Sequence, residues 1–586
     1  IKSTVLLVNG ELSAPFRGNA AGAPVDGQIQ LRQRKNVPAV SLKTTIGQID
    51  VGQALKKLKI PDIVTGIADA VNLDASSTGK TLRALGEQAV FTLQIKPANL
   101  SYTAEIVNQT VDIRVESATI AGRKEQPLTG TFSGSLRGTA FNAEISTANL
   151  KEIRKSDIPL PVQVAFQTED LQFKAEGTIS RPFENNAFEL RYELAGKEIE
   201  GLDTLVDFVV PLRGEFRASG RITGGGNRFT YEEDLRVGKS DLKADITVLR
   251  DPPRPRVTGR IVASQIHLGD VDIFDANKAA SANQDNSRVI PDYTLPVDAL
   301  LAVDLNLDIA AERIRAPLGD LGEFVSKISL KDGRFKSSLS VTGFKGEQII
   351  SELDVNAAVD PPLKQIQINA KDLNFGYLLS SMNLTDLIKG NIDLHVDLSG
   401  SGVTRYSFLG NAAGRITLIG GPAQITGGRI DLWAADLIPT MLSTSWQRDD
   451  VTETNCLVAH IELNEGQAEI EDLLLDTQRI TIAASGILDL KTEALNLIIA
   501  PRPKRASLVS LANPVRIEGT LAAPEVSVTR IPRGSRLAAG TGASLLAGLI
   551  NPAFLIFALS DTGTGEANPC DAAVEQVREA AGIDSQ

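Results

Sequence analysis

Histidine and cysteine, which often carry catalysis or hold metals, are few in this chain of 586 residues, which has three histidines and two cysteines. The histidines, His267, His395 and His460, fall on separate predicted strands, and none has a second ligand at a spacing typical of a metal site. His395 lies on the polar face of its strand, beside Asp393 and Asp397, which favours a solvated side chain. The histidines therefore predict no metal site.

Two glycine-containing motifs resemble nucleotide-binding loops, and neither fits. The Gly-Lys-Thr triplet at 79–81 resembles the end of a phosphate-binding loop, but Asp74 stands where the leading glycine is required. The glycine run at 224–226 lacks the strand-to-helix context of a dinucleotide site and predicts a hairpin turn. Carboxylates alternate with Leu or Ile on outward faces, where water is accessible and no raised pKa is expected. No nucleophile elbow and no Cys–His pair stands out, so we expect no enzyme, no metal and no cofactor.

The two cysteines, Cys456 and Cys570, allow two interpretations. Sparse, even cysteine usage is compatible with one structural disulfide in an oxidising compartment, which would tether the C-terminal segment to a strand. Two unpaired, buried thiols are the alternative, and the residues alone leave both open.

Alternating apolar and polar residues are the strongest structural signal. The segment LAVDLNLDI at 301–309 places its aliphatic residues on one face of a predicted strand and its polar residues on the other. The same pattern recurs at 90–96, 171–179, 391–400 and 481–490, and it predicts a mainly β chain. The positions that we expect to line one continuous apolar face are Leu301, Val303, Leu305, Leu307, Ile309, Ile392, Leu394, Val396, Leu398, Ile482 and Leu488.

Composition limits what this apolar face could bind. The net charge of −12 and the pI near 5.1 argue against a nucleic-acid partner, because a basic surface is lacking. Hydrophobic residues make up 42% of the chain and aromatic residues only 5%, so the apolar surface is aliphatic. The chain forms more apolar sheet face than its few predicted helices could cover. Such a surface usually marks a lipid, a membrane or a partner protein.

An internal repeat suggests a recurring unit of short helix, glycine and strand. Residues 50–66 and 374–390 align without a gap and share four residue types, at Gly52/Gly376, Leu55/Leu379, Asp62/Asp386 and Gly66/Gly390. Residues 199–214 are a looser third copy. Residues 276–288 carry almost no large apolar side chains and predict a mobile loop. The charge-free segment 543–559 contains Asn551-Pro552; we expect either a helix in a membrane interface or one packed on the end of the sheet.

These signals predict four regions along the chain. We expect β repeats over 1–200, further β repeats over 201–407 with a mobile loop at 276–290, a distinct β unit over 408–532, and an apolar helical segment with a tail over 533–586. No basic start followed by an apolar stretch opens the chain, which predicts neither a signal peptide nor a spanning helix in the given sequence. The start at Ile1 is typical of a fragment.

Several segments resemble the AsmA-like family, a branch of the repeating β-groove or bridge-like lipid transfer proteins. The resemblance extends along the whole chain and is strongest in 193–275, 295–345 and 408–570. Its most specific part is GGRIDLWAADLIPTML, followed by TNCLVAHIELNEGQAEIEDLLLDTQRITIAASGILDL, PVRIEGTLAAPEV and the late ANPC.

The resemblance implies a fold and a function. It implies an elongated, twisted, half-open β-groove of many antiparallel strands with a few short helices. It also implies a disulfide, because Cys456 and Cys570 fall at cysteine positions of the family. The implied function is periplasmic transfer of phospholipid acyl chains between the inner and outer membranes of a Gram-negative cell, supporting outer-membrane biogenesis. The parent protein would be anchored in the inner membrane by a segment missing here.

Two other functions compete with this expectation. A periplasmic scaffold or regulator of outer-membrane protein assembly would bind outer-membrane or envelope proteins through sheet edges or 543–559. An extracellular β-solenoid adhesin would require strict short repeats and ladders of identical residues, which the sequence lacks.

Overall fold

The computed structural model divides the chain into two compact units, unit 1 at Ile1–Asp251 and unit 2 at Pro252–Gln586. It describes residues 2–3, 5–8, 11–20, 22–34, 37–57, 64–104, 109–153, 158–180, 187–202, 212–271, 288–290, 294–316, 319–343, 346–376, 388–426, 451–478, 480–503, 515–528 and 569–583. The finer division into four regions stays a prediction.

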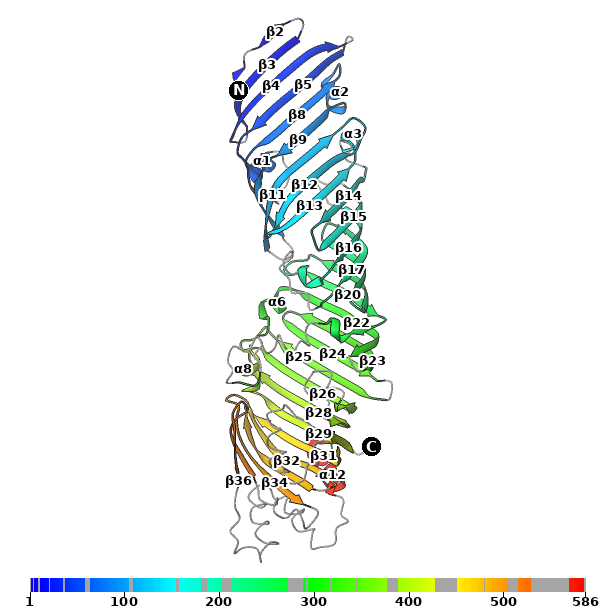
Figure 1. The fold of residues 1–586 in the computed structure, drawn as a ribbon, viewed down its shortest axis with the longest axis vertical. Coiled ribbons are helices and arrows are strands. Elements are labelled where there is room, and N and C mark those ends of the chain that lie inside the picture. Colours follow the sequence, from blue (N-terminus) through cyan, green and yellow to red (C-terminus); the bar gives the residue numbers. More distant parts are fainter. Residues whose placement is uncertain are drawn as a thin grey trace, which may run out of the picture. The chain divides into compact units, whose positions relative to one another are not determined.

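Unit 1 is an open sheet whose successive strands lie side by side (Figure 1), and the pairings within it are antiparallel. Its strands are β1 (Lys2–Ser3), β2 (Leu6–Val8), β3 (Glu11–Ala20), β4 (Ala23–Arg34), β5 (Val37–Ile46), β6 (Ile49–Asp50), β7 (Val64–Ala68), β8 (Val71–Thr78), β9 (Val90–Ile95), β10 (Ala98–Ala104), β11 (Gln109–Gly122), β12 (Leu128–Leu136), β13 (Thr139–Thr147), β14 (Leu160–Gln167), β15 (Leu171–Ser180), β16 (Ala187–Gly196), β17 (Phe216–Gly225), β18 (Arg228–Val237) and β19 (Ser240–Leu249).

Unit 2 is likewise an open, mostly antiparallel sheet (Figure 1). Its strands are β20 (Arg256–Ala263), β21 (Ile266–His267), β22 (Asp304–Ala316), β23 (Gly319–Lys331), β24 (Arg334–Thr342), β25 (Gln348–Asn356), β26 (Leu363–Asn374), β27 (Ile388–Lys389), β28 (Asn391–Ser401), β29 (Ala413–Gly420), β30 (Ala423–Thr426), β31 (Val451–Asn464), β32 (Gln467–Thr477), β33 (Ile480–Asp489), β34 (Ala494–Pro503), β35 (Val515–Thr520) and β36 (Pro524–Val528). The predicted fold class, mainly β with antiparallel strands and few short helices, is confirmed.

The described helices are short. They are α1 (Val51–Lys57), α2 (Leu82–Glu87), α3 (Leu150–Ile153), η1 (Ile199–Leu202), η2 (Leu268–Asp270), α6 (Val297–Ala302), α8 (Arg405–Leu409) and α12 (Pro569–Ala581). Thr81, the last residue of the triplet that resembles a phosphate-binding loop, is the N-cap of α2: its side chain accepts a hydrogen bond from the Ala84 backbone N–H. None of the helices in the described ranges is long and apolar enough to cross a membrane.

Tight turns fix the register between neighbouring strands. The two-residue turns Arg137-Gly138, Asp332-Gly333 and Glu465-Gly466 have positive φ at both positions. Such turns match the right-handed twist of the flanking strands, and glycine at the second position adopts this backbone without strain. The run at 224–226 also lies at a hairpin, as predicted, with Gly226 at φ 61° between β17 and β18.

The core of unit 1 lies where three stretches of the chain are each broken into two consecutive strands. Two residues separate β5 from β6, β7 from β8 and β9 from β10, and the long strand β11 is hydrogen-bonded to both β9 and β10. Small side chains allow close packing at these breaks, where Ala68 is fully buried. The buried cluster consists of Ala23, Ile49, Ala68, Ala98, Val115 and Ala118.

One correction concerns the segment that shows the clearest alternation. Residues 301–303 do not belong to the predicted strand, because Leu301 is in helix α6, Val303 is its C-cap, and β22 begins at Asp304. The reason is topological: β22 pairs in parallel with β20. Parallel neighbours need a crossover connection, and α6 forms its last part.

The described end of this crossover, residues 288–290 and 294–302, is here called the rim segment. Glu493, in the β33–β34 connection, accepts hydrogen bonds from the backbone N–H groups of Val289 (2.8 Å) and Ile290 (3.1 Å). The Leu295 backbone N–H donates to the Val403 carbonyl, 2.9 Å away, in the β28–β29 connection. The last residues of the predicted mobile loop, 288–290, are therefore held by specific hydrogen bonds.

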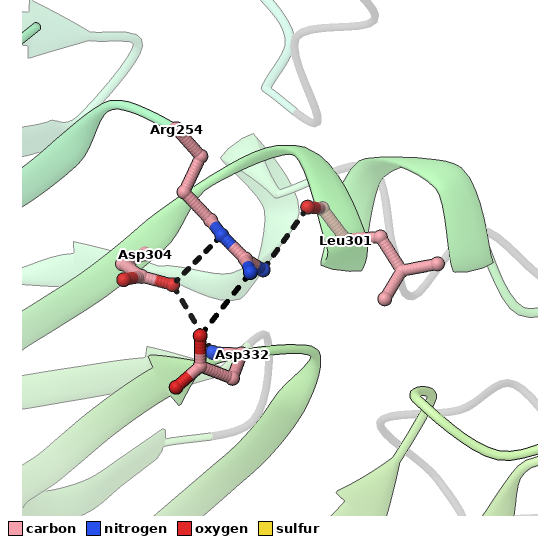
Figure 2. A network of polar contacts seen from close by, with 4 residues as sticks. All are labelled: Arg254, Leu301, Asp304 and Asp332. Carbon is pink, nitrogen blue, oxygen red and sulfur yellow. Dashed lines mark hydrogen bonds and ion pairs between the residues drawn. The ribbon is translucent and has the colours of Figure 1, made fainter. Parts of the chain in front are cut away.

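Arg254 fixes the other end of the rim segment (Figure 2). Its guanidinium donates to the Leu301 carbonyl at 3.3 Å and to Asp332 Oδ1 at 3.1 Å, and it lies 3.8 Å from Asp304 Oδ1. One side chain therefore joins the end of α6, the start of β22 and the β23–β24 turn. The rim segment is therefore hydrogen-bonded to the β33–β34 and β28–β29 connections, which lie at the same end of the strands of unit 2.

Several predicted features fall partly or wholly outside the described residues. In the first repeat copy, 50–66, helix α1 precedes β7, but most of the second and third copies is not described. Residues 276–287 of the predicted loop and the apolar segment 543–559 also lie outside.

Candidate functional site

Strand register in unit 2 gathers apolar side chains on one face, here called the apolar face. Residues directly opposite one another in paired strands place their side chains on the same side of the sheet. One such row crosses from β22 to β36 and is apolar except for two serines and one glycine. It consists of Ile309, Ser326, Leu339, Ser351, Ile368, Val396, Ile416, Ile461, Ile470, Gly486, Leu497, Ile517 and Val526.

A second row, parallel to the first, has the same character. It consists of Leu307, Ile328, Ser337, Leu353, Ile366, Leu398, Gly414, Leu463, Ala468, Leu488 and Leu495. Glycine is required at Gly486 in the first row, because its φ is +146° and a Cβ there would lie 2.2 Å from the Asn496 carbonyl oxygen. At Gly486 the backbones of β33 and β34 therefore approach too closely for a larger residue.

Most residues predicted to line an apolar face lie on this one. Leu307, Leu398 and Leu488 belong to one row, and Ile309 and Val396 belong to the other. The remaining strand residues have apolar or glycine neighbours in register: Leu305 opposite Leu330, Ile392 opposite Gly420, Leu394 opposite Leu418, and Ile482 opposite Leu475. Leu301 and Val303 precede the strand.

Within the described residues, the side chains of the apolar face pack against one another and no described helix covers them. Leu398 and Leu463 are buried in a cluster with Ala412 and Ala468, against which Val396 and Ile416 pack. Val396, Ile416 and Ile461 themselves stay only half-buried. Neighbouring strands therefore bury the sides of these side chains and leave their tips accessible.

Polar and charged residues dominate the opposite face, here called the polar face. Asp354 on β25 lies 2.7 Å from the Arg334 guanidinium and 3.4 Å from Lys336 Nζ, both on β24. The hydrogen bond and charge of Arg334 hold the pKa of Asp354 below its usual value. Alternation is imperfect, because Val325 and Ile350 lie on this face and are 40% and 41% exposed.

Helix α12 packs against the polar face rather than the apolar one. Cys570 on α12 forms a disulfide with Cys456 on β31, with a Cα–Cα distance of 5.9 Å. Val577 of the helix is buried in a hydrophobic cluster with Ile419, Val458 and Leu474. These strand residues alternate with those of the apolar face. In Figure 1, α12 lies beside β31 and β32.

Two histidines share a row of the polar face, which the sequence did not predict. His395 and His460 are both in register with Thr417. His460 is 1% exposed; its Nδ1 is 2.9 Å from Thr417 Oγ1, and its Nε2 is 3.2 Å from Glu462 Oε1. Burial lowers the pKa of His395, which is half-buried rather than freely solvated. Across the described ranges no cluster of three or more His, Cys, Asp or Glu side chains could hold a metal ion.

Unit 1 carries a similar apolar face. One row crosses it from β5 to β19 and consists of Thr44, Leu73, Leu93, Ile120, Gly130, Ile145, Val164, Ala175, Tyr192, Gly220, Glu233 and Ala244. Glu233 is the one charged residue in this row. Glu233 was not predicted as a site residue because it is adjacent to Glu232, yet its spacing of two from Tyr231 and Leu235 identifies its face.

The fold and the site define a protein with an open, mostly antiparallel sheet that presents a wide aliphatic surface. Comparison with known proteins agrees with this description. The AsmA family model matches residues 235–473. The chain is also 24% identical over 478 residues to the AsmA family protein YhjG of Escherichia coli (strain K12), a match that covers 77% of this chain and 67% of that protein.

Both comparisons support the resemblance of this chain to the AsmA-like family. Similarity to the AsmA family suggests a role in envelope and outer-membrane biogenesis.

Proposed function

We propose that this protein is a non-catalytic lipid-transfer protein that carries phospholipid acyl chains along its apolar face. The main supporting observation is the apolar row from Ile309 to Val526, which crosses paired strands from β22 to β36 and most of whose side chains are only partly buried. An acyl chain on this surface would avoid exposure to water, which costs about 0.8 kcal/mol per CH₂. The polar headgroup would stay outside this apolar row of unit 2.

We also propose that the protein acts in the periplasm, between the inner and outer membranes. The disulfide between Cys456 and Cys570 supports this location, because disulfides persist in oxidising compartments. The family match supports a role in the cell envelope. Transfer between the two membranes would be served by a surface along which a lipid can move without meeting water.

Substitutions on the two faces of strand β23 test the proposal. Ile328 lies on the apolar face and Val325 on the polar face of the same strand. Ile328→Asp should deplete phospholipid that co-purifies with the chain, because a carboxylate would enter the apolar row. Val325→Asp is the matched control and should leave the lipid content unchanged. Native mass spectrometry and lipid extraction measure both.

Two outcomes would contradict lipid carriage. One is a wild-type chain that is free of lipid and takes none up from vesicles. The other is equal lipid content in the Ile328→Asp and Val325→Asp variants. If Ile328→Asp still restored envelope integrity in cells that lack the protein, the result would favour a scaffold for outer-membrane protein assembly.

A further inference from the structure

Glu233 interrupts the apolar face of unit 1 and is paired with a tyrosine two strands away. The register places Tyr192 on β16, Gly220 on β17 and Glu233 on β18 in one row. The Tyr192 hydroxyl donates a hydrogen bond to Glu233 Oε2. The tyrosine side chain therefore reaches across β17 to the carboxylate.

Small residues on both sides of Glu233 make this arrangement possible. A Cβ on Gly220 would lie 3.0 Å from the Tyr192 hydroxyl oxygen and 2.2 Å from the Glu232 carbonyl oxygen. The partner of Glu233 on β19 is Ala244. Neither Gly220 nor Ala244 has a long side chain that would fill the space over the carboxylate, so a ligand could approach it from the apolar face of unit 1.

The positions around Glu233 on the same face of the sheet are uncharged. Every other position that the register places on this face of β16, β17, β18 and β19 is apolar, glycine, serine or tyrosine. Burial raises the pKa of Glu233 to about 7, and the negative charge of Asp234 contributes. Among the described residues, Tyr192 is the hydrogen-bond donor to Glu233, and Oε1 accepts none. The carboxylate thus lacks a cationic partner.

We propose that Glu233 and Tyr192 bind the primary ammonium group of an amphiphile whose chains lie on the apolar face of unit 1. This inference rests on the proposed function. A primary ammonium group carries donors for the open carboxylate oxygen and a charge that compensates the carboxylate. The aromatic rings of Tyr192 and Tyr231 on the same face favour a nearby cation. A quaternary ammonium group has no N–H, and a phosphate would be repelled.

Competition between two headgroups tests the proposal. The full chain is loaded from vesicles that contain equal amounts of phosphatidylethanolamine and phosphatidylcholine with identical acyl chains, and the bound lipid is quantified by mass spectrometry. We expect enrichment of the primary amine by about tenfold, which corresponds to one charge-assisted hydrogen bond. Glu233→Gln should abolish the enrichment without reducing total lipid, and Tyr192→Phe should weaken it.

The matched control is Glu232→Gln, which removes an adjacent carboxylate on the opposite face and should keep the wild-type ratio. A wild-type chain that takes up both lipids equally, or an unchanged ratio in Glu233→Gln, would overturn the assignment. Absence of any loading would instead contradict the proposed function. In that case calorimetry with n-dodecylamine and dodecyltrimethylammonium tests the site alone: selective binding that Glu233→Gln removes supports it, and equal or no binding overturns it.

Discussion

Cys456 on β31 and Cys570 on α12 are joined by a disulfide that holds the helix on the polar face of unit 2. A helix beside a half-apolar sheet would ordinarily be expected to cover the apolar side. Here the disulfide and the hydrophobic cluster around Val458 attach α12 to the polar side. Helix α12 consequently leaves the apolar side of the same strands uncovered.

Loss of this disulfide should loosen α12. The bond spans 114 residues, and the chain-entropy model gives about 4–5 kcal/mol of stabilisation for a loop of such length. We expect the double variant Cys456→Ser, Cys570→Ser to unfold at lower urea concentration and to exchange the amide hydrogens of 570–581 faster. Wild type treated with dithiothreitol should behave alike. Unchanged exchange in α12 would show that packing alone holds the helix.

Glu493 should be required to hold the rim segment. Its side chain is 1% exposed and accepts from two backbone N–H groups. Glu493→Gln replaces one acceptor oxygen by a donor and leaves one N–H unpaired, which should cost about 1–3 kcal/mol. Hydrogen exchange at Val289 and Ile290 would report the loss. Glu465→Gln, in an exposed turn, is the control; equal protection in both variants would argue against the anchor.

Arg254 should stabilise the junction of α6, β22 and the β23–β24 turn. Its side chain is 22% exposed and contacts three groups at once. Arg254→Lys keeps the charge but cannot reproduce the planar, branched donor set. We expect a loss of about 1–2 kcal/mol and faster amide exchange over 297–302, because hydrogen bonds to charged groups contribute in this range. Arg256→Lys, on the adjoining strand, provides the comparison.

The Arg334–Asp354 pair predicts a small acid sensitivity. The pKa of Asp354 is lowered in the folded state, chiefly by the hydrogen bond from Arg334, so its contribution exists above its unfolded pKa. That contribution disappears as pH falls below 3.8, through the folded pKa. Because the Arg334 side chain is 56% exposed, we expect less than about 1 kcal/mol.

Urea titrations of wild type and Asp354→Asn at neutral and acid pH measure this difference. It should be present at pH 7 and shrink as the pH falls below 3.8. A difference that persists unchanged at low pH would mean that packing, and not ionisation, accounts for the effect of the substitution.

Alternation was sufficient to predict strands and their faces where it was sustained. Residues 391–400 and 481–490 correspond closely to β28 and β33. It failed at 301–303, because the apolar residues of VDALLA suit a helix turn as well as a strand. Only the crossover to β22 and the hydrogen bond from Arg254 to the Leu301 carbonyl distinguish the two. In β18, the adjacent carboxylates concealed that Glu233 faces the apolar side.

The sequence by itself determined that this chain is mainly β, that its strands have an aliphatic face, and that Cys456 and Cys570 could pair. These properties follow from residue types and a period of two, which are local. Only the tertiary structure decided that the apolar positions join into continuous rows, that α12 covers the polar face, and that Tyr192 reaches Glu233. Strand register and the position of a distant helix depend on contacts between residues far apart in the chain, and local pattern does not specify those contacts.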